Sequence, residues 1–233
     1  MLNKIVQEDD RLAEELCDFN RNSCEITGAR HALDMWLTTR LSDGIICRLF
    51  GGIKGSSINI EKSEKSIDVW TSNEWYSMPL YYSLERGHKG VIVTINDFLL
   101  KDNAPKTLGT RIIATMVLQA TKIPGFDSIT ASATRWFYPI EGDELSREVI
   151  GYYFFPRLGF NADPKNADDY IDIPEKIKGK KLLQIMRNPD LRQWWKGNGQ
   201  TIDVKFKITD KRSLKALAAY LTEKRIRISI GEQ

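Results

Sequence analysis

Several features that would point directly to a function are scarce or missing in this 233-residue sequence. There are only two histidines, His31 and His88, which argues against a His-rich metal site. The three cysteines, Cys17, Cys24 and Cys47, are odd in number and lack metal-type spacing, so we expect free thiols in a reducing compartment rather than a disulfide framework. No apolar run approaches the roughly 20 residues that span a bilayer. The acidic N-terminus has no apolar signal region. Together these absences predict a cytoplasmic protein without a metal.

Internal repeats and low-complexity tracts are also missing, and the composition is that of a soluble globular chain. Hydrophobic residues make up 42% and charged residues 28%, enough to bury a core. The net charge of +3 is unevenly distributed, because residues 173–233 hold fifteen basic and six acidic side chains and carry +9, which leaves −6 for residues 1–172. A basic C-terminal part suits an acidic partner such as nucleic acid. The simpler explanations are that it docks on the acidic body or is solvated.

The first third of the chain predicts helices followed by short strands. Apolar spacing indicates a helix within residues 5–20, and Thr27 is a candidate cap for a second helix that ends at Asp43 and Gly44. The apolar run 45–50 is interpreted as a strand, and two more strands are expected within 55–63 and 65–72. An aromatic patch follows and either packs on the sheet or lines a cleft: Trp75, Tyr76, Tyr81 and Tyr82.

The stretch from Gly90 to Phe160 has the most organised pattern. The β-branched run 91–96 predicts a central strand buried on both faces. A loop over 101–110 leads to a helix over 111–122, for which Thr110 is the expected cap. SITASAT alternates as a strand does, residues 136–148 look irregular and acidic, and the aromatic segment GYYFFPRLGF closes the stretch. A glycine in a strand-to-helix turn, here Gly109, lets the backbone approach an anion at a helix N-terminus, although such glycines are common in α/β proteins.

Residues 173–233 predict an appended unit of helix, strand and helix. The first helix breaks at Asn188-Pro189 and a short helix with Trp194 and Trp195 follows. TIDVKFKIT alternates as a half-buried strand, and Ser213 is the expected cap of the last helix. We therefore predict an α/β protein with a main domain over 1–172 and a small basic α/β extension over 173–233.

The strand, the KTLGTR turn, the helix, the second strand and the closing Leu158-Gly159-Phe160 resemble the GNAT acetyltransferase fold. The resemblance covers roughly residues 5–172 and implies a mixed central β-sheet flanked by helices. In that family, a Gln/Arg-x-x-Gly-x-Gly/Ala turn holds the pyrophosphate of acetyl-coenzyme A with its backbone amides. The cofactor-binding residues implied here are Phe98, Leu99 and Leu100 beside the thioester, and Lys106, Thr107, Leu108, Gly109, Thr110 and Arg111 at the pyrophosphate.

Two positions depart from the family pattern. Arg111 stands where a small residue is usual, so its side chain either blocks the phosphates or supplies charge to them. Phe155 stands where a general-acid tyrosine is often found, which leaves the neighbouring Tyr152 and Tyr153 as candidate acids or as core aromatics. Asp97, at the end of the central strand, is a candidate base or a turn former.

Three functions follow as expectations. The first is an acyltransferase that moves an acetyl group from acetyl-coenzyme A to an unknown amine, with Asp97 as base and Tyr152 or Tyr153 as acid. The second is a non-catalytic GNAT-like protein that binds another protein, as in immunity or phage-associated roles. The third is a nucleic-acid-directed protein, including a toxin-like enzyme that acetylates charged transfer RNA, which rests on the basic C-terminal part.

Overall fold

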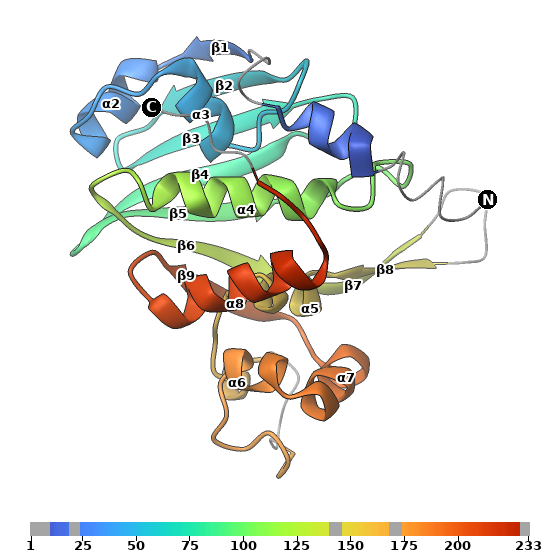
Figure 1. Ribbon diagram of the computed structural model, residues 1–233. Coiled ribbons are helices and arrows are strands. Elements are labelled where there is room, and N and C mark those ends of the chain that lie inside the picture. The colour runs from blue at the N-terminus through green and yellow to red at the C-terminus, as the bar shows by residue number, and fades with distance from the viewer. Residues whose placement is uncertain (1–9, 19–23, 140–145, 168–173, 229–233) are drawn as a thin grey trace. The chain divides into compact units, whose positions relative to one another are not determined.

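The computed structural model describes residues 10–18, 24–139, 146–167 and 174–228 (Figure 1). The chain is an α/β protein built on a mixed seven-stranded sheet, in the order β1-β2-β3-β4-β5-β6-β9. It divides into two compact units, which are described separately below. Unit 1 comprises residues 1–129 with 224–233, and unit 2 comprises residues 130–223. The domain boundary predicted between residues 172 and 173 lies outside the described residues.

Unit 1 carries most of the sheet. β1 (Glu25–Gly28) pairs in parallel with β2 (Ser57–Lys62), and β2, β3 (Ser66–Ser72), β4 (Leu80–Gly87) and β5 (Gly90–Asp97) pair antiparallel in turn. β6 (Phe126–Ala133) follows the helix after β5. The strands expected within 55–63 and 65–72 are confirmed, as is the one at SITASAT. β5 is present as predicted, but only alternate residues are fully buried, so the expectation of burial on both faces is wrong.

The helices of unit 1 are a helical stretch over residues 10–16, α2 (Arg30–Leu37), α3 (Asp43–Leu49) and α4 (Leu108–Ala120). Figure 1 shows α4 lying along β4 and β5. α3 packs beside α4, and the Arg48 guanidinium of α3 donates to the Gln119 side-chain oxygen of α4 at 2.8 Å in the buried interior. Twelve of the thirteen residues of α4 are buried, which makes it the central helix of this unit.

Three expectations for helix boundaries are wrong. Thr27 lies in β1 and does not cap a helix, since α2 begins at Arg30 after Ala29. The apolar run 45–50 is not a strand, because residues 45–49 belong to helix α3 and Phe50 is its C-cap. Ser42 caps the start of α3 by accepting from the Ile45 N–H. A short apolar run has no periodicity that separates a buried strand from a buried helix. α4 begins at Leu108, so Thr110 lies inside the helix and is not its cap.

The cysteines also differ in part from expectation. Cys24 and Cys47 form a disulfide that joins the start of β1 to α3, with their Cα atoms 6.2 Å apart. Cys17 is a free thiol, as predicted. The expectation of free thiols is therefore wrong for the pair, because residues 23 positions apart in sequence are brought together by the packing of α3.

Unit 2 is mainly helical. It contains α5 (Gly151–Arg157), η1 (Pro164–Asn166), α6 (Leu182–Arg187), α7 (Pro189–Asn198), β9 (Ile202–Lys207) and α8 (Lys211–Glu223). The helix break at Asn188-Pro189 and the alternating strand are confirmed. The segment 136–148 is not irregular throughout, since β7 (Arg135–Pro139) and β8 (Ser146–Ile150) form an antiparallel pair, with 140–145 outside the described residues. Ser213 is buried within α8 rather than capping it.

The core of unit 2 is aromatic. The rings of Phe155, Phe160 and Phe206 contact one another edge to face, at centroid distances of 5.1 and 5.4 Å. Trp195 is fully buried, and its indole N–H donates to the Tyr152 carbonyl at 3.0 Å. Gly159 adopts φ +97°, and a Cβ there would overlap the backbone of Ser213 in α8. The Leu158-Gly159-Phe160 segment therefore fits its place because a side chain at its centre would prevent α8 from packing.

Across the described residues, none of the helices combines the length and the apolar character needed to cross a membrane.

Candidate functional site

The predicted thioester end of the site lies where β5 ends. Asp97 is exposed and pairs across the strands with Tyr81. Leu99 accepts a hydrogen bond from the Ser77 N–H at 3.0 Å, and residue 100 forms an isolated antiparallel bridge with Tyr76. The segment 99–101, just after β5, therefore pairs with residues 75–77 through backbone hydrogen bonds.

The first turn of α4 packs directly on this segment. A Cβ at Gly109 would lie 3.3 Å from the Leu100 side chain and 3.4 Å from the Phe98 ring, so the glycine allows the helix to approach residues 98–100 closely. The Leu108 N–H donates to the carbonyl of residue 105, and the Thr107 hydroxyl donates to the Asp10 carboxylate at 2.9 Å. Phe98, Leu100 and Gly109 are therefore brought together, while Leu108, Gly109 and Thr110 are buried.

Lys106 is the exposed member of the predicted pyrophosphate turn. It precedes a 13-residue helix whose N-terminus carries the partial positive charge of the helix dipole. At the opposite end of the same helix, Lys122 is exposed as well. The two lysines therefore carry the same charge at opposite ends of α4. Lys106 is close enough to attract an anion at the start of the helix, and Lys122 is far from it.

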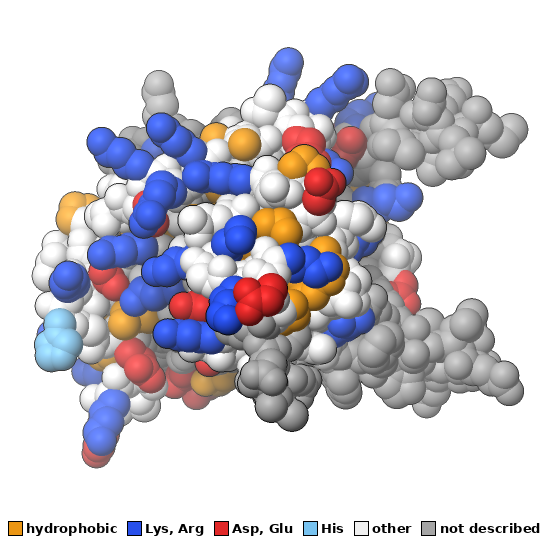
Figure 2. Space-filling model, turned by 90° about the horizontal axis from the view of Figure 1, so that it is seen from below, with side chains coloured by type: hydrophobic (Ala, Val, Ile, Leu, Met, Phe, Trp, Pro, Cys, Tyr) orange, Lys and Arg blue, Asp and Glu red, His pale blue; other side chains and the backbone are white. Residues whose placement is uncertain are grey.

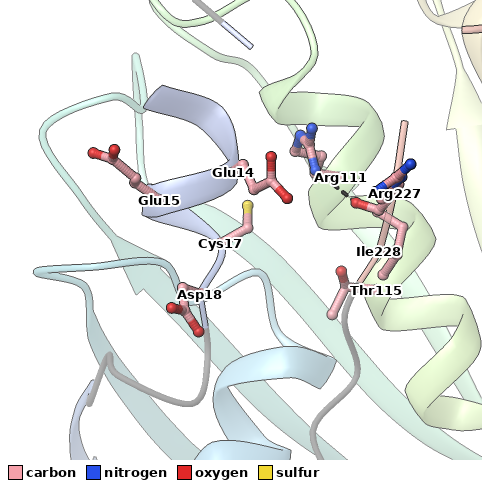
Figure 3. Close-up of a pocket in the computed structure, with 8 residues that line it drawn as sticks. All are labelled: Glu14, Glu15, Cys17, Asp18, Arg111, Thr115, Arg227 and Ile228. Carbon is pink, nitrogen blue, oxygen red and sulfur yellow. Dashed lines mark hydrogen bonds between the residues drawn. The ribbon is translucent and has the colours of Figure 1, made fainter. Parts of the chain in front are cut away.

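Arg111, in the first turn of α4, is buried in unit 1. Its side chain is only 5% exposed, and its Nη1 donates to the Arg227 carbonyl at 2.7 Å. Its Nε has no hydrogen-bond partner. Arg111 lines a cavity of about 290 Å³ (Figure 3). The full lining is Glu14, Glu15, Cys17, Asp18, Arg111, Thr115, Arg227 and Ile228.

The electrostatics of this cavity are mixed. Three carboxylates and two guanidinium groups belong to its lining, an arrangement that is unfavourable for the repeated negative charge of a pyrophosphate. Burial raises the pKa of the Cys17 thiol to about 12, and the charge of Arg111 offsets this only in part. Cys17 therefore remains a neutral thiol near pH 7 and is a poor nucleophile.

The two candidate acids lie in unit 2, within α5, whereas Asp97 belongs to unit 1. Tyr152 is fully buried, its hydroxyl donates to the Lys196 carbonyl at 2.6 Å, and Arg135 lies 5.2 Å from its ring centroid. These contacts give Tyr152 a structural role in the core of unit 2. Tyr153 is half-buried and is the more accessible of the pair.

A second hollow, of about 270 Å³, lies in unit 2 between α5, α6, α7 and α8. Its lining combines apolar side chains, among them Leu183, Met186 and Ala219, with basic ones. The basic lining residues are Arg157, Arg187, Arg192 and Lys215. In Figure 2, Lys and Arg side chains are spread over the face seen from below, with hydrophobic side chains among them. One carboxylate in this hollow, that of Glu223, lies 2.7 Å from Arg157 and 3.7 Å from Arg192.

The sequence did not reveal the cavity around Arg111. Its lining comes from residues 14–18, from α4 and from residues 227–228, which are more than two hundred positions apart at their extremes. The one available signal was an arginine on the apolar side of a helix that is otherwise almost entirely buried. Among the described residues, no group of three or more His, Cys, Asp or Glu side chains is arranged to hold a metal ion.

Comparison with protein-family models gives no matching family, and comparison with curated proteins and with solved structures gives no match either.

Proposed function

We propose that this chain is an acyl-coenzyme A-dependent N-acetyltransferase of the GNAT type, which transfers acetyl from acetyl-coenzyme A to an amine. The observation that carries the proposal is the succession of β5, the segment 98–107, α4 and β6 in a protein built on a mixed β-sheet. This is the order of elements around which GNAT enzymes bind their acyl donor. The expected location is cytoplasmic.

In this proposal the donor lies along the segment after β5. Phe98, Leu99 and Leu100 flank the thioester, and the first turn of α4 faces the pyrophosphate with Lys106 contributing positive charge. Asp97 is exposed at the end of β5 and serves as the base that deprotonates the amine. Of the two candidate acids, Tyr153 is preferred because the Tyr152 hydroxyl is already bonded to a backbone carbonyl.

The Asp10 carboxylate is the observation that favours a second candidate, a non-catalytic binding protein of the same fold. It accepts a hydrogen bond from Thr107 at the start of α4, where a donor phosphate would have to compete with its negative charge. In this alternative the scaffold binds a protein partner without transferring an acetyl group.

Calorimetric titration with acetyl-coenzyme A tests the proposal. Wild type is expected to bind, and Lys106→Glu is expected to weaken binding about tenfold or more, since reversing a charge beside a phosphate costs upwards of about 1.4 kcal/mol. Lys122→Glu reverses the same charge at the far end of α4 and should change the affinity less than about twofold. Absence of binding to the wild type would refute the proposal, and equal effects of the two variants would show that the donor does not lie at the start of α4.

Release of the coenzyme A thiol, followed with a thiol reagent across a panel of primary amines, separates the two candidates. Binding without thiol release for any amine would favour the binding protein. If turnover occurs, Asp97→Asn and Tyr153→Phe should each lower kcat by about 10² or more, within the range typical of general acid–base groups. Tyr152→Phe should leave kcat within about threefold while lowering stability by about 1 kcal/mol through its lost hydrogen bond.

The basic hollow of unit 2 keeps the nucleic-acid-directed alternative open as a prediction. Its clustered Arg and Lys side chains suit an anionic partner. Binding to transfer RNA that weakens steeply as salt rises from 50 to 200 mM would favour that alternative, because each neutralised phosphate releases counterions. Binding that is insensitive to salt would count against it.

A further inference from the structure

Arg111 is a buried cation for which the described residues provide no carboxylate partner. Its side chain is 5% exposed, a single hydrogen bond joins its Nη1 to the Arg227 carbonyl at 2.7 Å, and its Nε has no partner. A buried charge without a compensating group is strongly destabilising, so such a group usually has a counter-charge in the functional state. The neighbouring cavity is where a counter-charge from a ligand would enter.

One carboxylate of the cavity lining points toward Arg111. In Figure 3, the Glu14 carboxylate and the Cys17 sulfur point toward the side where Arg111 lies, whereas the Glu15 carboxylate points away from it. Glu15 instead pairs with Arg11, at 3.3 Å between Nε and Oε1. Glu14 and Arg111 are therefore the two groups of opposite charge that point toward one another across the cavity, whose charged lining also includes Asp18 and Arg227.

The remaining lining favours a small organic molecule. The Thr115 side chain is 1% exposed and its hydroxyl lies in the wall of the cavity, while Ile228 supplies an apolar surface. A volume of about 290 Å³ is enough for a free amino acid but lies at the lower end of pockets for larger ligands. A simple anion would be attracted by Arg111 but repelled by Glu14. A simple cation would be attracted by Glu14 but repelled by Arg111.

We propose that this cavity binds a small zwitterion of the α-amino-acid class, with its carboxylate against Arg111 and its ammonium group against Glu14. Such a ligand supplies the counter-charge that buried Arg111 lacks and pairs its ammonium group with Glu14, and guanidinium–carboxylate pairing is the strongest of the contacts available. All of the residues involved belong to unit 1, and the cavity lining does not include Phe98, Leu99, Leu100 or Lys106, which would contact the acyl donor in the proposed function.

The test is calorimetric titration of the full chain with four free amino acids as probes: glycine, L-leucine, L-glutamate and L-lysine. At least one is expected to bind with a dissociation constant in the millimolar range or tighter. For L-leucine, the matched probes are 4-methylpentanoate, which keeps the carboxylate alone, and 3-methylbutylamine, which keeps the ammonium group alone. Each of these two probes is expected to bind at least tenfold more weakly than L-leucine.

Two neighbouring glutamates provide a matched pair of variants. Glu14→Gln removes the inward carboxylate and should weaken binding about tenfold, whereas Glu15→Gln removes the outward one and should change the affinity less than twofold. Arg111→Met keeps the length of the side chain and should abolish measurable binding. Because it also removes an uncompensated buried charge, it should not lower the melting temperature of the ligand-free protein.

Three results would overturn the proposal. The first is absence of binding for all four amino acids, and the second is binding that survives both Glu14→Gln and Arg111→Met. The third is a melting temperature that falls in both variants without added ligand, with the double variant no worse than either single one. That outcome would mean that Glu14 itself closes on Arg111 as an internal ion pair.

Discussion

Removing the carboxylate of Glu223 is expected to destabilise unit 2 by far more than removing an exposed carboxylate that pairs with its cation at the same distance, 2.7 Å between nitrogen and oxygen. The Arg157 Nη2 lies 2.7 Å from both oxygens of Glu223. The side chain of Arg157 is 8% exposed and that of Glu223 is 45% exposed. The Arg157 guanidinium also lies 4.8 Å from the ring centroid of Tyr220, so its position is held from two sides.

The magnitude follows from the burial of the two partners. Breaking a fully buried pair by removing one partner costs about 3–5 kcal/mol, because the other charge is left without compensation. A fully exposed pair contributes only about 0–1 kcal/mol, since water solvates the freed charge. Arg157 is buried but Glu223 is about half exposed, so water reaches part of the site, and we expect Glu223→Ala to cost about 2 kcal/mol.

The chain contains a matched control in Glu175. Its carboxylate lies 2.7 Å from Lys178, but these side chains are 84% and 66% exposed. Glu175→Ala should therefore lower the free energy of unfolding by less than about 0.5 kcal/mol. Both variants are measured by urea unfolding followed by circular dichroism, with the slope m compared to confirm that the same transition is observed.

A double variant isolates the interaction itself. Arg157→Met combined with Glu223→Ala should cost at least about 1 kcal/mol less than the two single changes together, because removing both charges leaves neither one stranded. Equal losses for Glu223→Ala and Glu175→Ala would refute the reasoning, since burial would then have no effect on the strength of these pairs.

Three further predictions concern glycine and cysteine positions. Gly159→Ala should destabilise by about 2 kcal/mol or more, because φ is +97° and the added Cβ overlaps α8, whereas Gly197→Ala in α7 has nothing within 4 Å and should stabilise by about 0.5 kcal/mol in the same urea assay. Thiol titration of the urea-unfolded chain should find one thiol before reduction and three after it, and reducing the Cys24–Cys47 disulfide should cost about 3 kcal/mol; three thiols before reduction would contradict the disulfide. The pKa of Cys17 is raised from 9.0 to about 12, so the unfolded chain loses this proton above pH 9 while the folded chain keeps it, and stability should fall between pH 9 and 12. Between pH 8 and pH 10, wild type should lose about 1 kcal/mol more than Cys17→Ser, and equal losses would show an ordinary thiol.

Local patterns in the sequence were sufficient to predict most of the strands and the class of fold. Alternation of apolar and polar residues is a property of a few consecutive positions, so β2, β3 and β9 could be predicted without knowing their neighbours. The helix break at Asn188-Pro189 is equally local, because proline lacks the N–H that a continuing helix needs.

Only the tertiary structure decided the identity of fully apolar segments and the roles of single polar side chains. Residues 45–50 form part of a helix rather than a strand because α3 packs against α4, a contact between segments far apart in the chain. The expectation of free thiols at Cys24 and Cys47 was wrong for the same reason, since their disulfide depends on where α3 packs. Gly109 shows the contrast: the sequence indicated a turn that permits close approach of the backbone, and only the structure shows that the side chains of Phe98 and Leu100 approach it.

The sequence by itself therefore determined where hydrophobic surface must be buried and where the backbone must turn, since both depend on neighbouring residues. Which groups meet in a cavity depends on how distant segments pack, and no local pattern records it. Arg111 illustrates the limit, because its sequence position indicated a charge near the start of a helix. The packing of residues 14–18 and 227–228 turned that charge inward, toward Glu14, and gave unit 1 a cavity of mixed charge.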